Sequence, residues 1–184
     1  MALGTTDRPE LEQATRTGTI IAVAYSPELI DGIRKEPHPS AKVERWGIPG
    51  DRHYGERRYS STQKKIVLNE RPITVIAVEA TRAACEAIGL PYSTVPPGGM
   101  GENFLTEGLG DLSEVEEGDE VQVLNTEGEP KMILRVESQN PPCSSLKVYH
   151  KLMTKHMMHR RGLLCTVVLE GTVEVGDKVA IVKA

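Results

Sequence analysis

The chain has 184 residues, a formal net charge of -4 and three cysteines. This length suits one domain with a substantial core, and the acidic balance argues against a general nucleic-acid binder. An odd number of cysteines without a CxxC pair excludes a disulfide framework and a Cys-rich zinc site, and indicates a reducing compartment. No apolar run approaches the length of a membrane span, and the N-terminus has no apolar signal core. We therefore expect a cytoplasmic protein with neither a nucleic-acid nor a membrane partner.

The first third of the chain changes character twice. Residues 1–17 are polar and lack periodicity, which predicts a flexible tail. From Gly18 the sequence becomes β-branched, and residues 19–24 predict a strand. Residues 31–64 are rich in proline, glycine and charge, and this stretch is too long for an ordinary connection. It predicts a functional loop or structure of its own, with a short strand near residues 43–46.

The remainder of the chain alternates more regularly and is mostly strand-like. Residues 79–88 predict a short helix closed by Gly89, and residues 144–157 predict a second one. Apolar alternation or continuous apolar runs predict strands in the following ranges: 72–78, 120–124, 132–136, 163–169 and 179–182.

A short internal sequence repeat indicates how these strands are arranged. Val115 to Val121 and Val173 to Val179 both place Gly-Asp immediately before a strand. Glycine accepts a positive φ and aspartate caps a turn, so two such turns indicate a repeated corner in a closed or nearly closed sheet. The expected fold is a mainly-β barrel with a few short helices, spanning residues 18–184 as a single domain.

Cys143 is the first candidate for chemistry. It follows Pro141 and Pro142, and prolines keep a backbone extended and remove its donors, so the thiol can be presented to a ligand. Positive charges downstream would stabilise a thiolate, which is the form that acts as a nucleophile or metal ligand. A small buried apolar residue is the alternative, because most free cysteines have that role.

Two glycine-containing segments could approach a ligand closely. Between Gly50 and Gly55, Arg52 and His53 are available as hydrogen-bond donors. The second segment, residues 98–104, places three glycines before a Glu-Asn pair and resembles a nest of backbone N–H groups able to hold an anion. The competing interpretations are a charged turn and a flexible glycine loop.

A basic segment, residues 151–161, is the last candidate. His156 and His159 are three residues apart, which on a helix places both on one face. No suitably spaced carboxylate joins them, so an anion pocket in which Arg160 or Arg161 binds a phosphate is a better interpretation than a metal site. A solvated basic helix end is the alternative.

The order and spacing of these segments resemble those of the MOSC domain, the module named for the C-terminal region of molybdenum cofactor sulfurases and also found as stand-alone proteins. The similarity covers about residues 18–184. It rests on the following ranges: 47–53, 101–109, 117–119, 141–143, 160–162 and 168–177.

This resemblance implies a bent β-barrel associated with the molybdenum cofactor, a pterin-dithiolene that carries a phosphate and the metal. The family's cysteine, here Cys143, is proposed to carry a persulfide for metal-sulfur centres, and in some members it ligates molybdenum while the domain reduces N-hydroxylated compounds. Both roles suit a soft thiolate. The pyridoxal-phosphate desulfurase domain of the sulfurases has no counterpart here, so we expect no pyridoxal phosphate and a separate cysteine desulfurase or electron-transfer partner.

The expected site therefore combines the resemblance with the segments above. Cys143, Asn103 and His53 are the expected catalytic residues, and Cys143 is also the expected metal ligand. The residues expected to bind the cofactor are Arg52, Gly101, Glu102, His156, Arg160 and Arg161. The alternative is a non-enzymatic module that binds a phosphorylated ligand or a partner protein and has a structural, buried Cys143.

Overall fold

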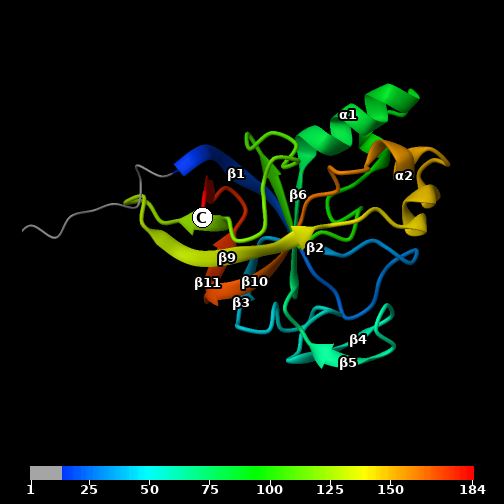
Figure 1. Ribbon diagram of the computed structural model, residues 1–184. Coiled ribbons are helices and arrows are strands. Elements are labelled where there is room, and N and C mark those ends of the chain that lie inside the picture. Colours follow the sequence, from blue (N-terminus) through cyan, green and yellow to red (C-terminus); the bar gives the residue numbers. More distant parts are fainter. Residues whose placement is uncertain (1–13) are drawn as a thin grey trace, which may run out of the picture.

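The computed structural model describes residues 14–184, and its centre is a closed β-barrel (Figure 1). Within the described residues, seven strands pair in a ring in the order β12, β8, β9, β10, β6, β7 and β1, and β1 pairs again with β12. Every pairing in the ring is antiparallel except β6 with β7. The bounds are β1 (Ala14–Ala24), β6 (Ile73–Ala77), β7 (Phe104–Glu107), β8 (Glu120–Leu124), β9 (Pro130–Gln139), β10 (Leu163–Leu169) and β12 (Lys178–Val182).

The barrel interior is filled by the inward-facing members of these strands. Val121 and Val123 of β8 alternate with more polar neighbours and face Met132 and Leu134 of β9 within one buried cluster. Register shifts in β1, β9 and β10 bend the strands, which lets a sheet of this size close on itself.

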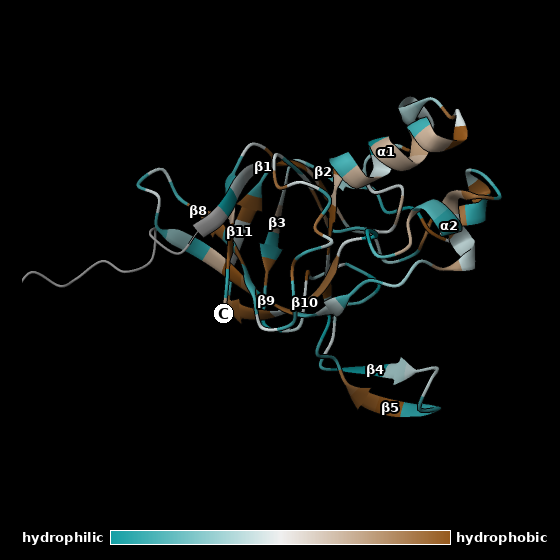
Figure 2. Ribbon diagram, turned by 45° about the horizontal axis from the view of Figure 1, so that its top comes forward, coloured by the Kyte–Doolittle hydropathy of each residue, from teal (hydrophilic) through white to brown (hydrophobic). Residues whose placement is uncertain are grey.

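Smaller strands lie outside the ring. β2 (Pro37–His38) extends the sheet beside β1, and β3 (Ser40–Val43) pairs with β11 (Gly171–Glu174). β4 (Arg57–Ser60) and β5 (Lys65–Leu68) form a hairpin that stands away from the barrel, as Figures 1 and 2 show. Of the two interpretations of the stretch 31–64, structure of its own is confirmed, but the short strand expected near residues 43–46 is wrong, because the strand formed there is β3 at Ser40–Val43.

The helices gather at one end of the molecule, where α1 and α2 lie side by side (Figure 1). Their apolar residues form a second buried cluster that includes Cys85, Leu146, Met153 and Met157. The bounds are α1 (Val78–Ile88), α2 (Met153–His156) and the 3-10 helices η1 (Tyr92–Thr94) and η2 (Ser144–Val148). None of the helices within residues 14–184 is long and apolar enough to cross a membrane.

The mainly-β, barrel-shaped prediction is confirmed, and so is the repeated corner. The backbone N–H of Glu116 donates to Asp119 Oδ2 at 2.8 Å, and that of Glu174 donates to Asp177 Oδ2 at 2.7 Å. The glycine before each aspartate has a positive φ. The two Gly-Asp turns therefore use the same hydrogen bond to open β8 and β12, which are neighbours in the barrel.

Two further predicted boundaries are wrong. Residues 14–17 belong to β1, because pairing with β12 supplies a hydrogen-bonded ladder that their polar composition does not reveal; the rest of the expected tail lies outside the described residues. The expected helix at 144–157 is divided into η2 and α2. Between them the N–H of Leu152 donates to His150 Nδ1 at 3.2 Å, and β-branched Val148 is a poor helix former.

Candidate functional site

Cys143 lies on an extended link between the end of β9 and η2, with φ of -117°, and it is exposed. The two other cysteines, Cys85 and Cys165, are buried, and burial raises the pKa of both thiols. The link is fixed at both ends: the N–H of Asn140 donates to Gly162 O at 2.8 Å, and Thr154 Oγ1 donates to Cys143 O at 3.3 Å. The Cys143 thiol is therefore exposed on a backbone fixed at both ends, and the alternative of a buried cysteine is wrong.

The surroundings of Cys143 favour a thiolate. Partial burial acts to raise the pKa of its thiol, but hydrogen bonding with Ser145 and the positive charge of Arg161 outweigh burial, so that the pKa is lowered from its usual value. Because the thiolate is the nucleophilic and metal-binding form, this thiol is the one best prepared for chemistry among the three cysteines.

Cys143 opens onto a cavity of about 210 Å³. Three other residues that the sequence singled out, His53, Gly101 and Arg161, line the same cavity. Gly101 has φ of +83°, and a Cβ placed there would lie 3.2 Å from Ile33 O, so a glycine leaves the wall open. The structure therefore brings the thiol, an imidazole and a guanidinium together from three separate chain segments.

Arg161 connects the chain segments that form this cavity. Its side chain is buried, and it donates from Nη1 to Pro141 O at 2.9 Å and from Nη2 to Met100 O at 3.1 Å. Its Nε is buried without a hydrogen-bond partner. The guanidinium thus joins the cysteine segment to the glycine segment and keeps one buried donor unused, which suits a site that receives an anion or a sulfur.

Gly162 sets the position of Arg161. Its φ is +92°, and a Cβ at this residue would lie 2.0 Å from Val75 O and 3.0 Å from Ile76 Cα. No side chain fits, so the backbone beside Arg161 packs directly on β6.

His53 is oriented by a buried carboxylate that the sequence analysis missed. Asp51 Oδ2 lies 3.6 Å from His53 Nδ1 and 3.0 Å from Lys35 Nζ, and the Lys35 and Asp51 side chains are 0% and 1% exposed. Burial acts to raise the pKa of Asp51, but the contact with the His53 ring and the charge and hydrogen bond of Lys35 outweigh it and hold the pKa well below its usual range. Asp51 is therefore an ionised support behind an imidazole that is half exposed in the cavity.

Asn103 does not line the cavity. Its Nδ2 donates to Ala24 O at 3.1 Å and to Asp51 Oδ2 at 3.3 Å, while its Oδ1 accepts the N–H of Thr74 at 3.0 Å. The side chain is 1% exposed. The expected catalytic role is not supported by this placement, because the amide is already used to join β1, β6 and Asp51 beneath the site.

Glu102 also has an internal role. The expected nest of backbone N–H groups exists, but it holds the carboxylate of Glu102 itself, which accepts from Gly98 N–H at 2.8 Å and from Met100 N–H at 2.9 Å. Burial raises the pKa of this carboxyl. An external anion cannot occupy these donors, so Glu102 stabilises the loop that carries Gly101.

Of the basic residues in the segment 151–161, only Arg161 lines the cavity. His156 ends α2 and His159 has φ of +59°, so the two do not share a helix face. Neither they nor Arg160 line the cavity, and the charge of Arg160 acts on Asp111 instead. Within residues 14–184, no group of three or more His, Cys, Asp or Glu side chains could hold a metal ion.

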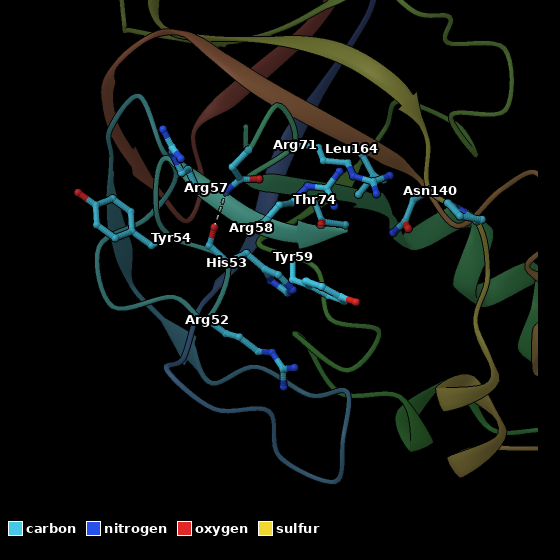
Figure 3. Close-up of a pocket in the computed structure, with 12 residues that line it drawn as sticks. Arg52, His53, Tyr54, Arg57, Arg58, Tyr59, Arg71, Thr74, Asn140 and Leu164 are labelled. Atoms are coloured by element: carbon cyan, nitrogen blue, oxygen red, sulfur yellow. Dashed lines mark hydrogen bonds between the residues drawn. The ribbon is translucent and has the colours of Figure 1, made fainter. Parts of the chain in front are cut away.

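A larger cavity of about 620 Å³, shown in Figure 3, shares part of its wall with the first one. His53, Thr74, Asn140 and Leu164 line both. Arg52, expected to bind the cofactor, lies here with three arginines that the sequence analysis did not single out, Arg57, Arg58 and Arg71. The β4–β5 hairpin and its flanks therefore supply most of the positive charge of the site, and Arg161 is the one basic residue of 151–161 that lines either cavity.

These features define a class of protein: a small bent barrel that presents one activated cysteine beside a buried arginine and a cationic cavity. The MOSC domain family matches residues 49–180, so the chain belongs to the MOSC domain family. The expected resemblance is confirmed.

The chain is also similar to named bacterial proteins. The chain is 24% identical over 152 residues to YuaD of Bacillus subtilis (strain 168), covering 73% of this chain and 76% of YuaD, whose name proposes a part in metal-sulfur cluster biosynthesis. The crystal structure of B. subtilis YuaD has the same fold, with a TM-score of 0.78 and 21% identity over 91% of this chain and 97% of that one. YiiM from Geobacillus stearothermophilus is similar at a TM-score of 0.61 and 21% identity, over 90% of this chain and 75% of its own.

Proposed function

We propose that this protein binds the molybdenum-pterin cofactor in the cavity around Cys143 and that Cys143 is a sulfur ligand of the metal. The observation that carries the proposal is the exposed Cys143 thiol, whose pKa is lowered and which lines one cavity with Arg161 and His53. A soft thiolate suits a metal-sulfur centre. Membership of a family associated with this cofactor supports the same ligand.

The residues present fit such a group. Cys143 supplies the sulfur donor, the unpartnered Nε of Arg161 supplies a buried donor, and the missing side chain of Gly101 leaves room at the wall. When bound, the cofactor would supply oxygen-atom or sulfur chemistry at the metal. The chain's own contribution is to hold Cys143 ionised through Ser145 and Arg161.

His53 would hold or release a proton at the cavity. Its Nδ1 is turned to the ionised Asp51, so that its other ring nitrogen can face a ligand. Reduction of N-hydroxylated compounds, which some family members carry out, would draw on such a proton and on electrons from a separate partner.

Metal and pterin content test the ligand role. The protein isolated from cofactor-producing cells should contain molybdenum and pterin in equal amounts, and Cys143→Ser should lose most of both. Cys85→Ser is the matched control, because Cys85 is a cysteine buried in α1 away from the cavity, and it should keep them. Wild-type protein without molybdenum, or equal occupancy in Cys143→Ser, would refute the ligand role.

Sulfur carriage is the second candidate function. The thiol is exposed, so a persulfide on a partner cysteine desulfurase can reach it, and the name of YuaD points to metal-sulfur cluster biosynthesis for that relative. The thiolate would attack the outer sulfur of the partner's persulfide, and the partner cysteine would leave as a thiolate. Peptide mass spectrometry after incubation with a desulfurase and cysteine should find one added sulfur atom on Cys143 and none on Cys85 or Cys165.

A further inference from the structure

The larger cavity concentrates positive charge in a protein that is negatively charged overall. Arg52, Arg57, Arg58 and Arg71 all line it, and Figure 3 shows their side chains around one hollow. They come from the loop after Asp51, from β4 and from the turn before β6, so the fold assembles the cluster from separate segments.

These guanidinium groups have no carboxylate partner among the ion pairs of residues 14–184, and none takes part in a side-chain hydrogen bond there. The Nε of Arg58 is buried without a partner. Glu70 and Glu137 lie in an adjoining cavity that Arg58 and Arg71 also line, but neither comes within ion-pair distance. Burial, and then the neighbouring Arg71, lower the pKa of Arg58.

Arg58 and Arg71 are half-buried like charges, and the charge of Glu70 offsets their repulsion only in part, so an anionic ligand between them would relieve it. Guanidinium groups match the geometry of phosphate oxygens and bind them through paired, charge-assisted hydrogen bonds. We propose that this cavity is a phosphate-binding subsite, in which Arg58 and Arg71 bind the anion and Arg52 and Arg57 complete its neutralisation at the more exposed side.

The rest of the wall indicates what the phosphate is attached to. Tyr54 and Tyr59 line the same cavity and are 42% and 62% exposed. Tyr54 is held in place by donating from its hydroxyl to Glu44 Oε2 at 2.8 Å. Such rings offer an apolar face to a planar group, so the ligand is a phosphate ester of a molecule with an aromatic or pterin-like ring.

The two cavities share His53, Thr74, Asn140 and Leu164, so a ligand bound through its phosphate extends toward Cys143. The phosphate could belong to the cofactor itself or to a phosphorylated substrate. The anion-binding chemistry is the same in both cases and does not depend on the proposed role of Cys143.

Inorganic pyrophosphate is the probe, titrated calorimetrically into the protein free of cofactor at constant ionic strength. Wild-type protein should bind it, and the double variant Arg58→Gln/Arg71→Gln should bind at least about tenfold more weakly, because two charge-assisted contacts are removed. The matched control is Arg45→Gln/Arg135→Gln, which removes the same charge from exposed arginines outside the cavity and should change the affinity less than about twofold.

Absence of pyrophosphate binding to wild-type protein, or equal affinity in the two double variants, would overturn the proposal. If the Arg58→Gln/Arg71→Gln variant does not fold, Arg57→Gln provides the same comparison at an exposed position, with Arg45→Gln as its control. Equal pyrophosphate affinity in Arg57→Gln and Arg45→Gln would also overturn the proposal.

A second titration identifies the source of the phosphate. If pterin-loaded protein no longer binds pyrophosphate, the cavity holds the phosphate of the cofactor; if it binds as well as unloaded protein, the cavity serves a phosphorylated substrate. Either result supports an anion subsite. Because the first titration uses cofactor-free protein, it remains decisive even if no molybdenum is ever retained.

Discussion

Replacement of Arg161 by methionine, compared with replacement by lysine, separates the electrostatic and the structural role of this side chain. The guanidinium lowers the pKa of Cys143, after Ser145, and its two Nη groups donate to Pro141 O and Met100 O. Methionine keeps much of the volume but removes the charge and both hydrogen bonds. The variant should therefore have a less reactive thiol and a less stable fold.

The magnitudes follow from these contacts. A carbonyl left without its buried donor costs about 1–3 kcal/mol, so losing two should lower the free energy of unfolding by about 2–6 kcal/mol. The Cys143 thiol is exposed, so solvent limits its pairing with Arg161 to about 1 kcal/mol at most, which is roughly a fivefold change in the thiolate fraction. Alkylation of Cys143 at neutral pH should then be about threefold to fivefold slower.

The assay is the rate of iodoacetamide alkylation, followed by peptide mass spectrometry, together with urea unfolding. Cys85 and Cys165 are buried and should stay unlabelled, which shows that the variant is folded. Arg161→Lys is the control: it keeps the charge, so the alkylation rate should stay within about twofold of wild type, but it cannot serve both carbonyls and should still lose stability. Alkylation of Arg161→Met as fast as that of wild type would refute the electrostatic reasoning.

Three further outcomes follow from the buried groups. Asp51→Asn should lower the free energy of unfolding by about 3–5 kcal/mol, because Lys35 is left as a buried unpaired charge, whereas Asp31→Asn removes only an exposed ion pair and should cost less than about 1 kcal/mol in the same urea titration. The pKa of Asp51 is lowered in the folded state, so its contribution to the free energy of unfolding is present above the unfolded-state pKa and should be lost as the pH falls below about 4. In acid unfolding curves, Asp51→Asn should therefore lose less stability than wild type between neutral and low pH. Gly162→Ala should cost about 3 kcal/mol or more through its clash with β6, while Gly176→Ala, also at positive φ but with nothing within 4 Å, should cost only about 1 kcal/mol; equal thermal shifts for the two would contradict this.

The barrel could be predicted because its strands carry their own signal. The apolar run at Leu163–Leu169 coincides with β10, and the Gly-Asp repeats mark real corners. The β4–β5 hairpin gave no such signal, because it stands away from the core and needs no apolar alternation (Figure 2). Its Ile66 and Leu68 remain exposed.

The site was harder to predict than the fold. Hydrogen bonds and ion pairs between residues far apart in the sequence decide which polar side chains remain available to a ligand. The sequence predicted Asn103 and Glu102 as residues that contact a ligand. In the fold, Asn103 donates a hydrogen bond to Asp51, and Glu102 accepts hydrogen bonds from the backbone N–H groups of its own loop. Lys35 and Asp51 lie in separate loops and meet only in the folded chain.

The cationic cavity did leave one trace in the sequence. Four arginines within 20 residues are unusual in an acidic chain, but the sequence does not show that the β4–β5 hairpin brings them to one cavity. They are Arg52, Arg57, Arg58 and Arg71. The basic segment at 151–161 is equally rich in positive charge, and only the fold shows that Arg161 alone turns inward.

X-ray absorption at the molybdenum edge tests the role of Cys143 most directly. In protein isolated with its cofactor, the account predicts one more sulfur around molybdenum than the pterin dithiolene supplies. That extra sulfur should be absent from whatever metal Cys143→Ser retains and present in Cys85→Ser. The same sulfur count in wild type and Cys143→Ser would contradict the assignment of Cys143 as the metal ligand.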